Sequence, residues 1–145
     1  MKSREDIVHM LNKKRPGGLN KFDKPYRVLI VDDSTTMRRI IGQQLKSEAY
    51  DICGEAADGE EAFQMYKELE PDVVTLDINM PVMDGIEALK KILDWDKEAR
   101  ILMLTSEGQK QIVVDAISNG AKGYIVKPPN KAKVCNKVKS VLESQ

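Results

Sequence analysis

The sequence predicts an α/β protein built on a doubly wound, five-stranded parallel sheet, and two patterns along the chain carry this prediction. Short apolar runs, of the kind that a strand buried on both faces requires, alternate with longer segments whose apolar residues recur at helical spacing. Strands that alternate with amphipathic helices form βαβ units, in which helices cover both faces of a parallel sheet. The sequence has no repeat with a period of about 20 to 50 residues, which excludes a solenoid.

Each predicted strand is followed by one predicted helix. The first apolar run is continuous and β-branched, the second is weaker and is expected at an edge of the sheet, and the other three resemble the first. The predicted strands cover Val28–Val31, Asp51–Ala56, Val73–Leu76, Ile101–Leu104 and Tyr124–Val126. The helical stripes that follow them run from Met37 to Leu45, Ala62 to Leu69, Ile86 to Leu93, Ile112 to Ile117 and Val134 to Leu142.

The composition is that of an ordinary single-domain protein, and it argues against several functions. The chain has 145 residues, 41% of them hydrophobic and 5% aromatic, and its 23 basic and 23 acidic side chains give a net charge of zero. This balance favours neither a stacking platform for single-stranded nucleic acid nor a general attraction to nucleic acid. Cys53 and Cys135 lack C-x-x-C spacing, and neither a secretory signal nor a membrane span of ~20 apolar residues is present. We therefore expect a cytoplasmic protein with no integral membrane segment and no nucleic-acid partner.

Residues 1–25 are expected to form a basic N-terminal extension, and residues 26–145 the folded domain. Residues 1–26 hold seven basic and three acidic side chains, a net charge of +4. Ser3 and Asp6 have the spacing of a helix capping box, and the apolar residues that follow predict a short helix from about Arg4 to Lys14. The Pro16-Gly17-Gly18 breaker predicts a linker between this helix and the domain.

Polar residues follow four of the five predicted strands. Asp32 and Asp33 follow the first strand, Asp77 the third, Thr105 the fourth and Lys127 the fifth. Each has an ordinary structural explanation, since Asp33 or the serine after it could cap a helix, Thr105 suits a strand and Lys127 suits a solvated loop. In open parallel sheets, however, ligands bind beyond the carboxyl ends of the strands, so all five side chains are expected on one rim. That coincidence predicts a functional site.

The residue types in this set predict a magnesium-dependent phosphate acceptor. Clustered carboxylates repel one another unless a cation joins them, and oxygen ligands without a nearby His or Cys favour Mg²⁺. A carboxylate beside that metal can attack phosphorus and form an aspartyl phosphate. A lysine and a hydroxyl at the neighbouring strand ends would bind the other phosphoryl oxygens.

Four segments of the chain together strongly resemble the receiver domain of two-component response regulators. They are Val28–Asp33, Asp77–Gly85, Leu104–Ser106 and Tyr124–Pro128. The resemblance covers about residues 26 to 144 and is greatest to the free-standing chemotaxis regulators of that family. It implies a flavodoxin-like sheet with the strand order 2-1-3-4-5.

The resemblance implies a role for each residue of the rim. Asp77 is implied to be the phosphoacceptor, and Lys127 is implied to contact the phosphoryl group. Asp32, Asp33 and Asp77, together with the backbone carbonyl of Asn79, are implied to hold Mg²⁺.

The resemblance also implies a switch and an output surface. Thr105 and Tyr124 would form the coupled switch, while the side chains of Asn79 and Glu107 would flank the attacking water and so set the lifetime of the phosphorylated form. The positions that match the output face combine apolar and basic groups, which suit an acidic amphipathic partner helix. They are Lys110, Val113, Tyr124, Val126 and Lys137.

Some positions near the site depart from the family pattern. Pro129 stands where many receivers carry an aromatic residue, and Ile78 stands where the chemotaxis regulators carry a tryptophan. Trp95 falls instead at the end of the third helical stripe, so we do not expect its fluorescence to report on the site. The Lys127-Pro128 bond matches the position where receivers carry a cis peptide.

The resemblance implies a free-standing chemotaxis response regulator that accepts a phosphoryl group and is not itself an enzyme. The implied partners are a histidine kinase of the CheA type, the flagellar motor switch protein FliM, and a dedicated phosphatase of the CheX, CheC or CheZ type. The last helical stripe ends close to Gln145, so we expect no DNA-binding or catalytic output domain. Output is therefore expected through binding by the receiver itself.

Three other functions fit the sequence less well than this one. A phosphorelay intermediate would pass the phosphoryl group to a histidine phosphotransfer protein, and Tyr124 at the switch position favours the chemotaxis regulator over it. A phosphohydrolase of the haloacid dehalogenase type would need a second acid two residues beyond the nucleophile, where Asn79 stands. A flavodoxin-like FMN binder is disfavoured because three acids at the rim would repel the cofactor phosphate unless a metal intervened.

Overall fold

The computed structural model describes residues 3–4 and 15–143, and in them the predicted alternation of strands and helices is confirmed. Each strand lies within one residue of its predicted bounds. The elements follow one another as β1 (Arg27–Val31), α2 (Thr35–Lys46), β2 (Asp51–Ala56), α3 (Gly59–Leu69), β3 (Val73–Asp77), α4 (Gly85–Trp95), β4 (Ile101–Thr105), α5 (Lys110–Ser118), β5 (Gly123–Val126) and α6 (Lys131–Glu143).

The five strands form one parallel sheet in the order β2-β1-β3-β4-β5, as the resemblance implied. Every residue of the interior strands β3 and β4 is buried. The edge strand β2 is mostly only partly buried, and its pairing shifts register between Val28 and Leu29 of β1, which agrees with its weaker apolar pattern. Because the strands are parallel, all their carboxyl ends lie along one rim of the sheet.

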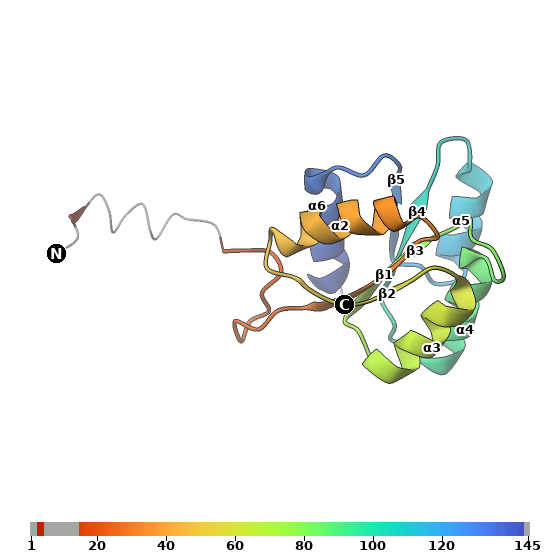
Figure 1. Cartoon of the computed structure of the whole chain (residues 1–145), viewed down its shortest axis with the longest axis horizontal. Coiled ribbons are helices and arrows are strands. Elements are labelled where there is room, and N and C mark those ends of the chain that lie inside the picture. The colour runs from red at the N-terminus through yellow and green to blue at the C-terminus, as the bar shows by residue number, and fades with distance from the viewer. Residues whose placement is uncertain (1–2, 5–14, 144–145) are drawn as a thin grey trace.

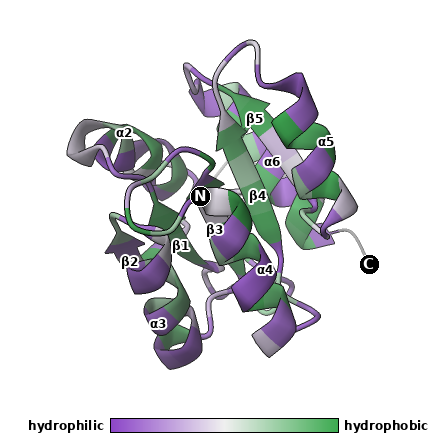
Figure 2. Ribbon diagram, turned by 90° about the vertical axis from the view of Figure 1, so that its right-hand side faces the viewer, coloured by the Kyte–Doolittle hydropathy of each residue, from purple (hydrophilic) through white to green (hydrophobic). Residues whose placement is uncertain are grey.

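Helices cover both faces of the sheet (Figure 1). α2 and α6 pack together on one face, and α3, α4 and α5 lie on the other. Since alternate residues of a strand point to opposite faces, Val28 and Ile30 join the apolar cluster under α2 and α6, while Leu29 and Val31 join the cluster on the other face. Apolar residues accordingly gather on the strands in Figure 2. No helix in the described part of the chain is long and apolar enough to cross a membrane.

Four helices begin at a side-chain cap on the rim side of the sheet, and for α6 the cap is Asn130, whose Oδ1 accepts the N–H of Lys133 at 2.9 Å. The Ser34 hydroxyl accepts a hydrogen bond from the backbone N–H of Met37 at 3.2 Å and caps α2. Asp58 and Asp84 cap α3 and α4 in the same way, at 2.8 and 2.9 Å. Because Ser34 fills the capping role at α2, the carboxylate of Asp33 is left for the rim.

Residues 15–25, which were expected to be a linker, are joined to the domain by backbone hydrogen bonds. The N–H of Gly18 donates to the carbonyl of Glu48 at 2.7 Å, and the N–H of Tyr26 donates to the carbonyl of Gly18 at 2.7 Å. A Cβ on residue 18 would lie 2.4 Å from the carbonyl oxygen of Glu48, so glycine allows this close approach. The segment thus packs against the turn between α2 and β2. The helix predicted over residues 4–14 lies, apart from its first residue, outside the described residues.

Candidate functional site

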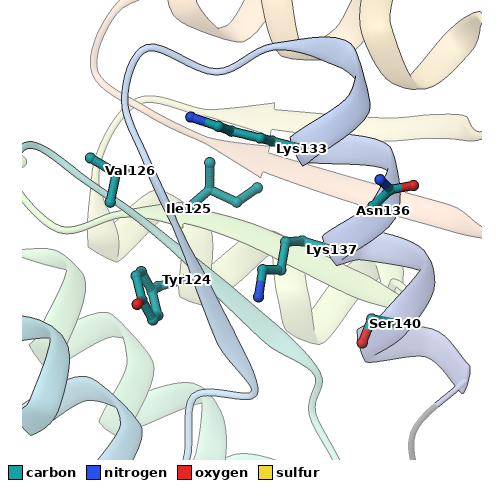
Figure 3. A pocket seen from close by; sticks show the side chains of 7 residues that line it. All are labelled: Tyr124, Ile125, Val126, Lys133, Asn136, Lys137 and Ser140. Carbon is teal, nitrogen blue, oxygen red and sulfur yellow. The ribbon is translucent and has the colours of Figure 1, made fainter.

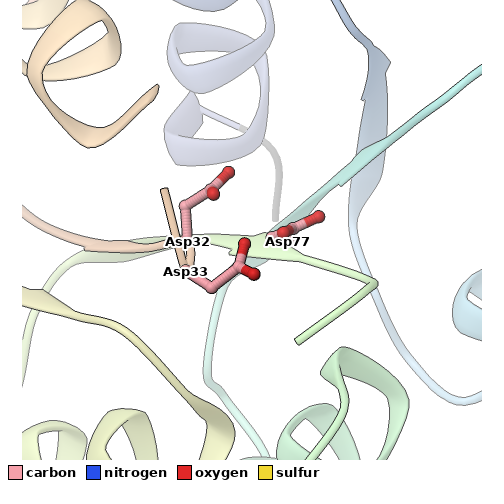
Figure 4. A group of neighbouring side chains, drawn as sticks. All are labelled: Asp32, Asp33 and Asp77. Carbon is pink, nitrogen blue, oxygen red and sulfur yellow. The ribbon is translucent and has the colours of Figure 1, made fainter. Parts of the chain in front are cut away.

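The structure brings the five predicted rim residues to one end of the sheet. Asp32 and Asp33 follow β1, Asp77 ends β3, Thr105 ends β4 and Lys127 follows β5. β3 lies between β1 and β4, and β4 pairs with β5, so adjacent strands deliver these side chains. Figure 4 shows the three carboxylates clustered where β1 and β3 end.

The three carboxylates form a set that can hold a cation. One oxygen of each of Asp32, Asp33 and Asp77 lies within 4.8 Å of the others. Asp32 and Asp77 are buried, with 1% and 4% of their surface exposed, whereas Asp33 faces solvent. Hard oxygen donors with one side open to water match Mg²⁺, which keeps several waters while one or two carboxylates bind it. The donor set therefore fits the magnesium ion that the sequence predicted.

The loop after β3 holds Asp77 in place. The N–H of Asn79 donates to Oδ1 of Asp77 at 3.3 Å, and the N–H of Gly85 donates to the carbonyl of Ile78 at 2.8 Å. A Cβ on residue 85 would lie 2.2 Å from the carbonyl oxygen of Asp77, so the start of α4 packs directly against the backbone of the candidate acceptor. This close approach explains why the Asp77–Gly85 motif ends in glycine.

Lys127 is the cation that faces the two buried carboxylates. Its Nζ lies 3.0 Å from Oδ2 of Asp32 and 3.3 Å from Oδ1 of Asp77. Burial alone would lower the pKa of Lys127, but the hydrogen bond to Asp32 and the charge of Asp77 outweigh burial and raise that pKa above its ordinary value. The ammonium group is therefore charged at neutral pH and compensates the acidic pair.

The electrostatics of Asp77 favour a further cation at the rim. Burial raises the pKa of Asp77, the charge of Asp32 raises it further, and Lys127 opposes both effects. A single lysine therefore does not fully compensate the two buried carboxylates, and Asp77 ionises less readily than an ordinary aspartate. A divalent ion on their open side would relieve the repulsion that remains.

Sequence reasoning missed Arg38, which supports the acidic rim. Arg38 donates from Nη1 to the carbonyl oxygen of Asp32 at 2.6 Å and from Nε to Oε1 of Glu55 at 3.1 Å. These contacts tie the end of β1 to β2 and hold the backbone that carries both aspartates. A signal for this role exists, because Arg38 lies one helical turn after Ser34 and side chains on a helix lean toward its N-terminus.

The two predicted switch residues border one space. Thr105 is buried, with 2% of its surface exposed, and its hydroxyl donates to Oε1 of Gln109 at 2.8 Å. Tyr124 on the neighbouring strand β5 is 43% exposed. A hollow of about 710 Å³ is lined by both residues and by Lys127. Glu107 lies in the same loop as Gln109 and faces solvent.

The predicted output residues lie together on one surface, formed by the start of α5, by β5 and by α6. Figure 3 shows Tyr124 of β5 beside Lys137 of α6, where a second hollow of about 510 Å³ opens. The Nζ of Lys137 lies 6.0 Å from the centroid of the Tyr124 ring. Lys110 is also exposed, while Val113 and Val126 are partly buried between these charges. The surface therefore combines apolar and basic groups, as the sequence predicted.

The structure also places three of the other positions that were compared with the family pattern. The Lys127-Pro128 peptide is cis, as predicted. The carbonyl of Pro129 accepts a hydrogen bond from Nε2 of Gln44 at 3.3 Å, so α2 holds the loop that lacks the aromatic residue. Trp95 is the last residue of α4, about 15 Å along the helix from the end that touches Asp77, and is 61% exposed.

A parallel sheet of this order, with three carboxylates and a lysine at its carboxyl rim, defines a receiver, the phosphoacceptor module of two-component signalling. The family model for the response regulator receiver domain matches residues 28–139, and the chain belongs to this family.

Among receivers, the chain is of the CheY type. It is 43% identical to chemotaxis protein CheY of Treponema pallidum over 145 residues, which are 99% of this chain and 100% of that protein. It is 44% identical to chemotaxis protein CheY of Thermotoga maritima over 115 residues, 79% of this chain and 96% of that one. A chain in the crystal structure of the CheX-CheY-BeF3-Mg²⁺ complex from Borrelia burgdorferi is 45% identical, with a TM-score of 0.87 over 90% of this chain and 100% of that chain.

Proposed function

We propose that this protein is a free-standing chemotaxis response regulator that accepts a phosphoryl group on Asp77, in the cytoplasm, from a histidine kinase of the CheA type. One observation carries the proposal, namely that the buried carboxylate of Asp77 lies beside the carboxylates of Asp32 and Asp33 and the ammonium group of Lys127. The identity to a CheY protein over nearly the whole chain supports the chemotaxis assignment.

The chemistry follows from the contacts of Asp77. One of its carboxylate oxygens attacks the phosphorus of a phosphohistidine, and the N–P bond breaks with its electron pair left on the imidazole nitrogen. When bound by Asp32, Asp33, Asp77 and the backbone carbonyl of Asn79, Mg²⁺ supplies positive charge for the transferring group. Lys127, with its Nζ 3.3 Å from Oδ1 of Asp77, is close enough to bind a phosphoryl oxygen. The protein thereby assists its own phosphorylation without being an enzyme that turns over a separate substrate.

The phosphoryl group is proposed to be read through Thr105 and Tyr124. A phosphoryl oxygen offers the Thr105 hydroxyl a charged acceptor, and movement of that hydroxyl vacates space for the Tyr124 ring. The hollow of about 710 Å³ that both residues border supports this movement. The output surface would then differ between the two states, and its apolar and basic groups suit an acidic amphipathic helix of the motor switch protein FliM.

Loss of the phosphoryl group is proposed to end the signal. Asn79 and Glu107 are both exposed in loops that follow rim residues, and we assign to them the rate at which water hydrolyses the acyl phosphate. A dedicated phosphatase of the CheX, CheC or CheZ type would accelerate this step. The similar chain from Borrelia burgdorferi comes from a complex that contains CheX, which supports the first of these types.

Phosphotransfer from phosphorylated CheA tests the proposal. Labelled phosphate is expected to move to the wild-type protein in the presence of Mg²⁺, and neither to Asp77→Asn nor to the wild type in EDTA. Asp94→Asn, which changes an exposed acid near the end of α4, is the matched control and should accept phosphate normally. Transfer to Asp77→Asn at the wild-type rate would overturn the assignment. Passage of the label onward to a histidine phosphotransfer protein, with no binding to FliM, would instead identify a relay intermediate.

A further inference from the structure

Gln109 makes two hydrogen bonds to the end of β4 that the proposed function does not use. Its Oε1 accepts the hydroxyl proton of Thr105 at 2.8 Å and the backbone N–H of Ser106 at 3.0 Å. The N–H of Ser106 can only donate, so the amide group must present its oxygen to it. With these two donors, both lone pairs of the Gln109 oxygen are engaged.

The turn between β4 and α5 brings Gln109 back to the strand. Gly108 has a φ of +85°, a left-handed conformation that favours glycine, and this lets the chain reverse at that point. Gln109 occupies the N-cap position of α5, yet its side chain makes no capping hydrogen bond to the helix. The side chain of an N-cap residue ordinarily accepts a hydrogen bond from its own helix, whereas that of Gln109 accepts from Thr105 and Ser106.

We propose that Gln109 is a positioning residue that holds Thr105 in the arrangement of the unphosphorylated protein and so sets how readily the switch responds. The inference rests on the proposed function, in which the Thr105 hydroxyl turns toward the phosphoryl group on Asp77. That hydroxyl has one proton, so it cannot donate to Gln109 and to a phosphoryl oxygen at once. Each phosphorylation event must therefore break the 2.8 Å hydrogen bond between Thr105 and Gln109.

The burial of Thr105 makes loss of its hydrogen bond to Gln109 costly. Because only 2% of the residue is exposed, water does not readily replace a lost acceptor. The other acceptor in reach is the carbonyl oxygen of Ser106. It lies 3.2 Å from the Thr105 hydroxyl oxygen, which is farther than the Gln109 oxygen at 2.8 Å. Removal of the Gln109 oxygen takes the Thr105 hydrogen bond from the unphosphorylated arrangement, whereas the hydroxyl in the phosphorylated arrangement keeps its phosphoryl acceptor. A mimic of the phosphoryl group should then bind more tightly.

Beryllofluoride with Mg²⁺, titrated against the full chain, is the probe. Gln109→Leu removes the acceptor, and Gln109→Asn keeps an amide that is one methylene too short to reach Thr105. Both variants are expected to bind beryllofluoride about 2- to 12-fold more tightly than the wild type, the range that one net hydrogen bond spans. Gln109→Glu keeps an oxygen at the same reach and is expected to show no gain. Gln111→Leu changes an exposed glutamine in the first turn of α5 and serves as the matched control, with unchanged binding.

A double-mutant cycle separates this role from a merely structural one. In the Thr105→Val background, which lacks the hydroxyl, Gln109→Leu is expected to leave beryllofluoride affinity unchanged, whereas an effect through loop structure would persist. Unchanged or weaker binding in both Gln109→Leu and Gln109→Asn would overturn the inference, as would persistence of the gain without the hydroxyl. Failure of the wild type to bind beryllofluoride, or equal binding by Asp77→Asn, would overturn the proposed function itself and is a separate result.

Discussion

Lys127 pairs with Asp32 across the rim, its Nζ 3.0 Å from Oδ2 of a carboxylate that is almost fully buried. The two residues are far apart in the sequence, since one follows β5 and the other follows β1. A buried carboxylate needs a countercharge, since loss of one partner from a buried ion pair leaves the other charge uncompensated in a desolvated place. A lysine and a divalent cation can each supply that countercharge.

Replacement of Lys127 should therefore destabilise the protein in a metal-dependent way. In EDTA, the unfolding free energy of Lys127→Met is expected to be about 1–3 kcal/mol below that of the wild type. Loss of one partner from a fully buried ion pair would cost more, but the lysine side chain is 21% exposed. Saturating Mg²⁺ should reduce this loss, because the ion compensates the same carboxylates. Urea unfolding with and without Mg²⁺ measures the difference. Lys139→Met removes an exposed pair with Glu143 and should stay within about 0.5 kcal/mol in both conditions. An equal loss for Lys127→Met in EDTA and in Mg²⁺ would contradict the shared role.

The stability of the metal-free protein should depend on pH through Asp77. Its pKa is raised by burial and by the charge of Asp32, so the folded state holds the proton more tightly than the unfolded state does. Unfolding free energy should then fall as pH rises from the ordinary pKa of an aspartate through the raised pKa of Asp77. Asp77→Asn cannot ionise and should lack this fall, which makes it more stable than the wild type at neutral pH in EDTA.

Urea titrations between about pH 4 and pH 7, all in EDTA, measure this effect. Asp94→Asn, whose acid is exposed, controls for the removal of a carboxylate and should follow the wild-type curve. Parallel stability curves for the wild type and Asp77→Asn would show that Asp77 does not carry the shift.

Two adjacent glycines test whether residues 15–25 are part of the fold. A Cβ on Gly18 would lie 2.4 Å from backbone atoms of the turn between α2 and β2, whereas a Cβ on Gly17 would have its nearest neighbours at 3.7 and 3.8 Å. Gly18→Ala is therefore expected to lower the unfolding free energy by about 1–3 kcal/mol, and Gly17→Ala to change it little. Both variants should accept phosphate on Asp77 at the wild-type rate, because the segment precedes β1 and lies away from the carboxyl rim. Equal stability of the two variants would mean that the segment contributes nothing to the fold.

The sheet and its rim could be predicted from the sequence because both depend on local patterns. A continuous apolar run predicts a buried strand wherever it lies, and side chains at the carboxyl ends of parallel strands converge whatever the loops between them do. On this basis the sequence predicts that Asp32, Asp77 and Lys127 lie together. In the structure both carboxylates are within 3.3 Å of the Lys127 ammonium group.

Contacts made by loops and by the outer faces of helices carry no such periodic signal. Gln109 reaches Thr105 only because the chain reverses at Gly108, and residues 15–25 dock through backbone groups of a turn some 30 positions away. Periodicity also overstates burial, since Ile40 and Ile117 belong to predicted apolar stripes yet are 37% and 44% exposed. Helical spacing identifies the side of a helix but not how far the neighbouring elements extend over it.

Asn79 and Glu107 should control the lifetime of the phosphorylated form without affecting its formation. They stand two residues beyond Asp77 and Thr105, in the loops after β3 and β4, and both side chains are exposed. Exposed side chains contribute little to folding, so alanine at either position should change the unfolding free energy by no more than about 0.5 kcal/mol. Water that attacks the acyl phosphate must approach from the open side of the rim, where these polar groups can orient it. Asn79→Ala and Glu107→Ala are each expected to slow autodephosphorylation about 3- to 10-fold through the loss of one hydrogen-bond partner.

Decay of the labelled protein after removal of the phosphodonor measures that rate directly. Glu98→Ala, an exposed acid in the turn between α4 and β4 at the opposite end of the sheet, is the control and should decay like the wild type. Because the proposed phosphotransfer depends on Lys127 and on the carboxylates of Asp32, Asp33 and Asp77, both test variants should still accept phosphate from CheA with Mg²⁺ present. If both decay at the wild-type rate, neither side chain positions the attacking water, and the lifetime must be set by Asp77, Lys127 and the metal-binding carboxylates alone.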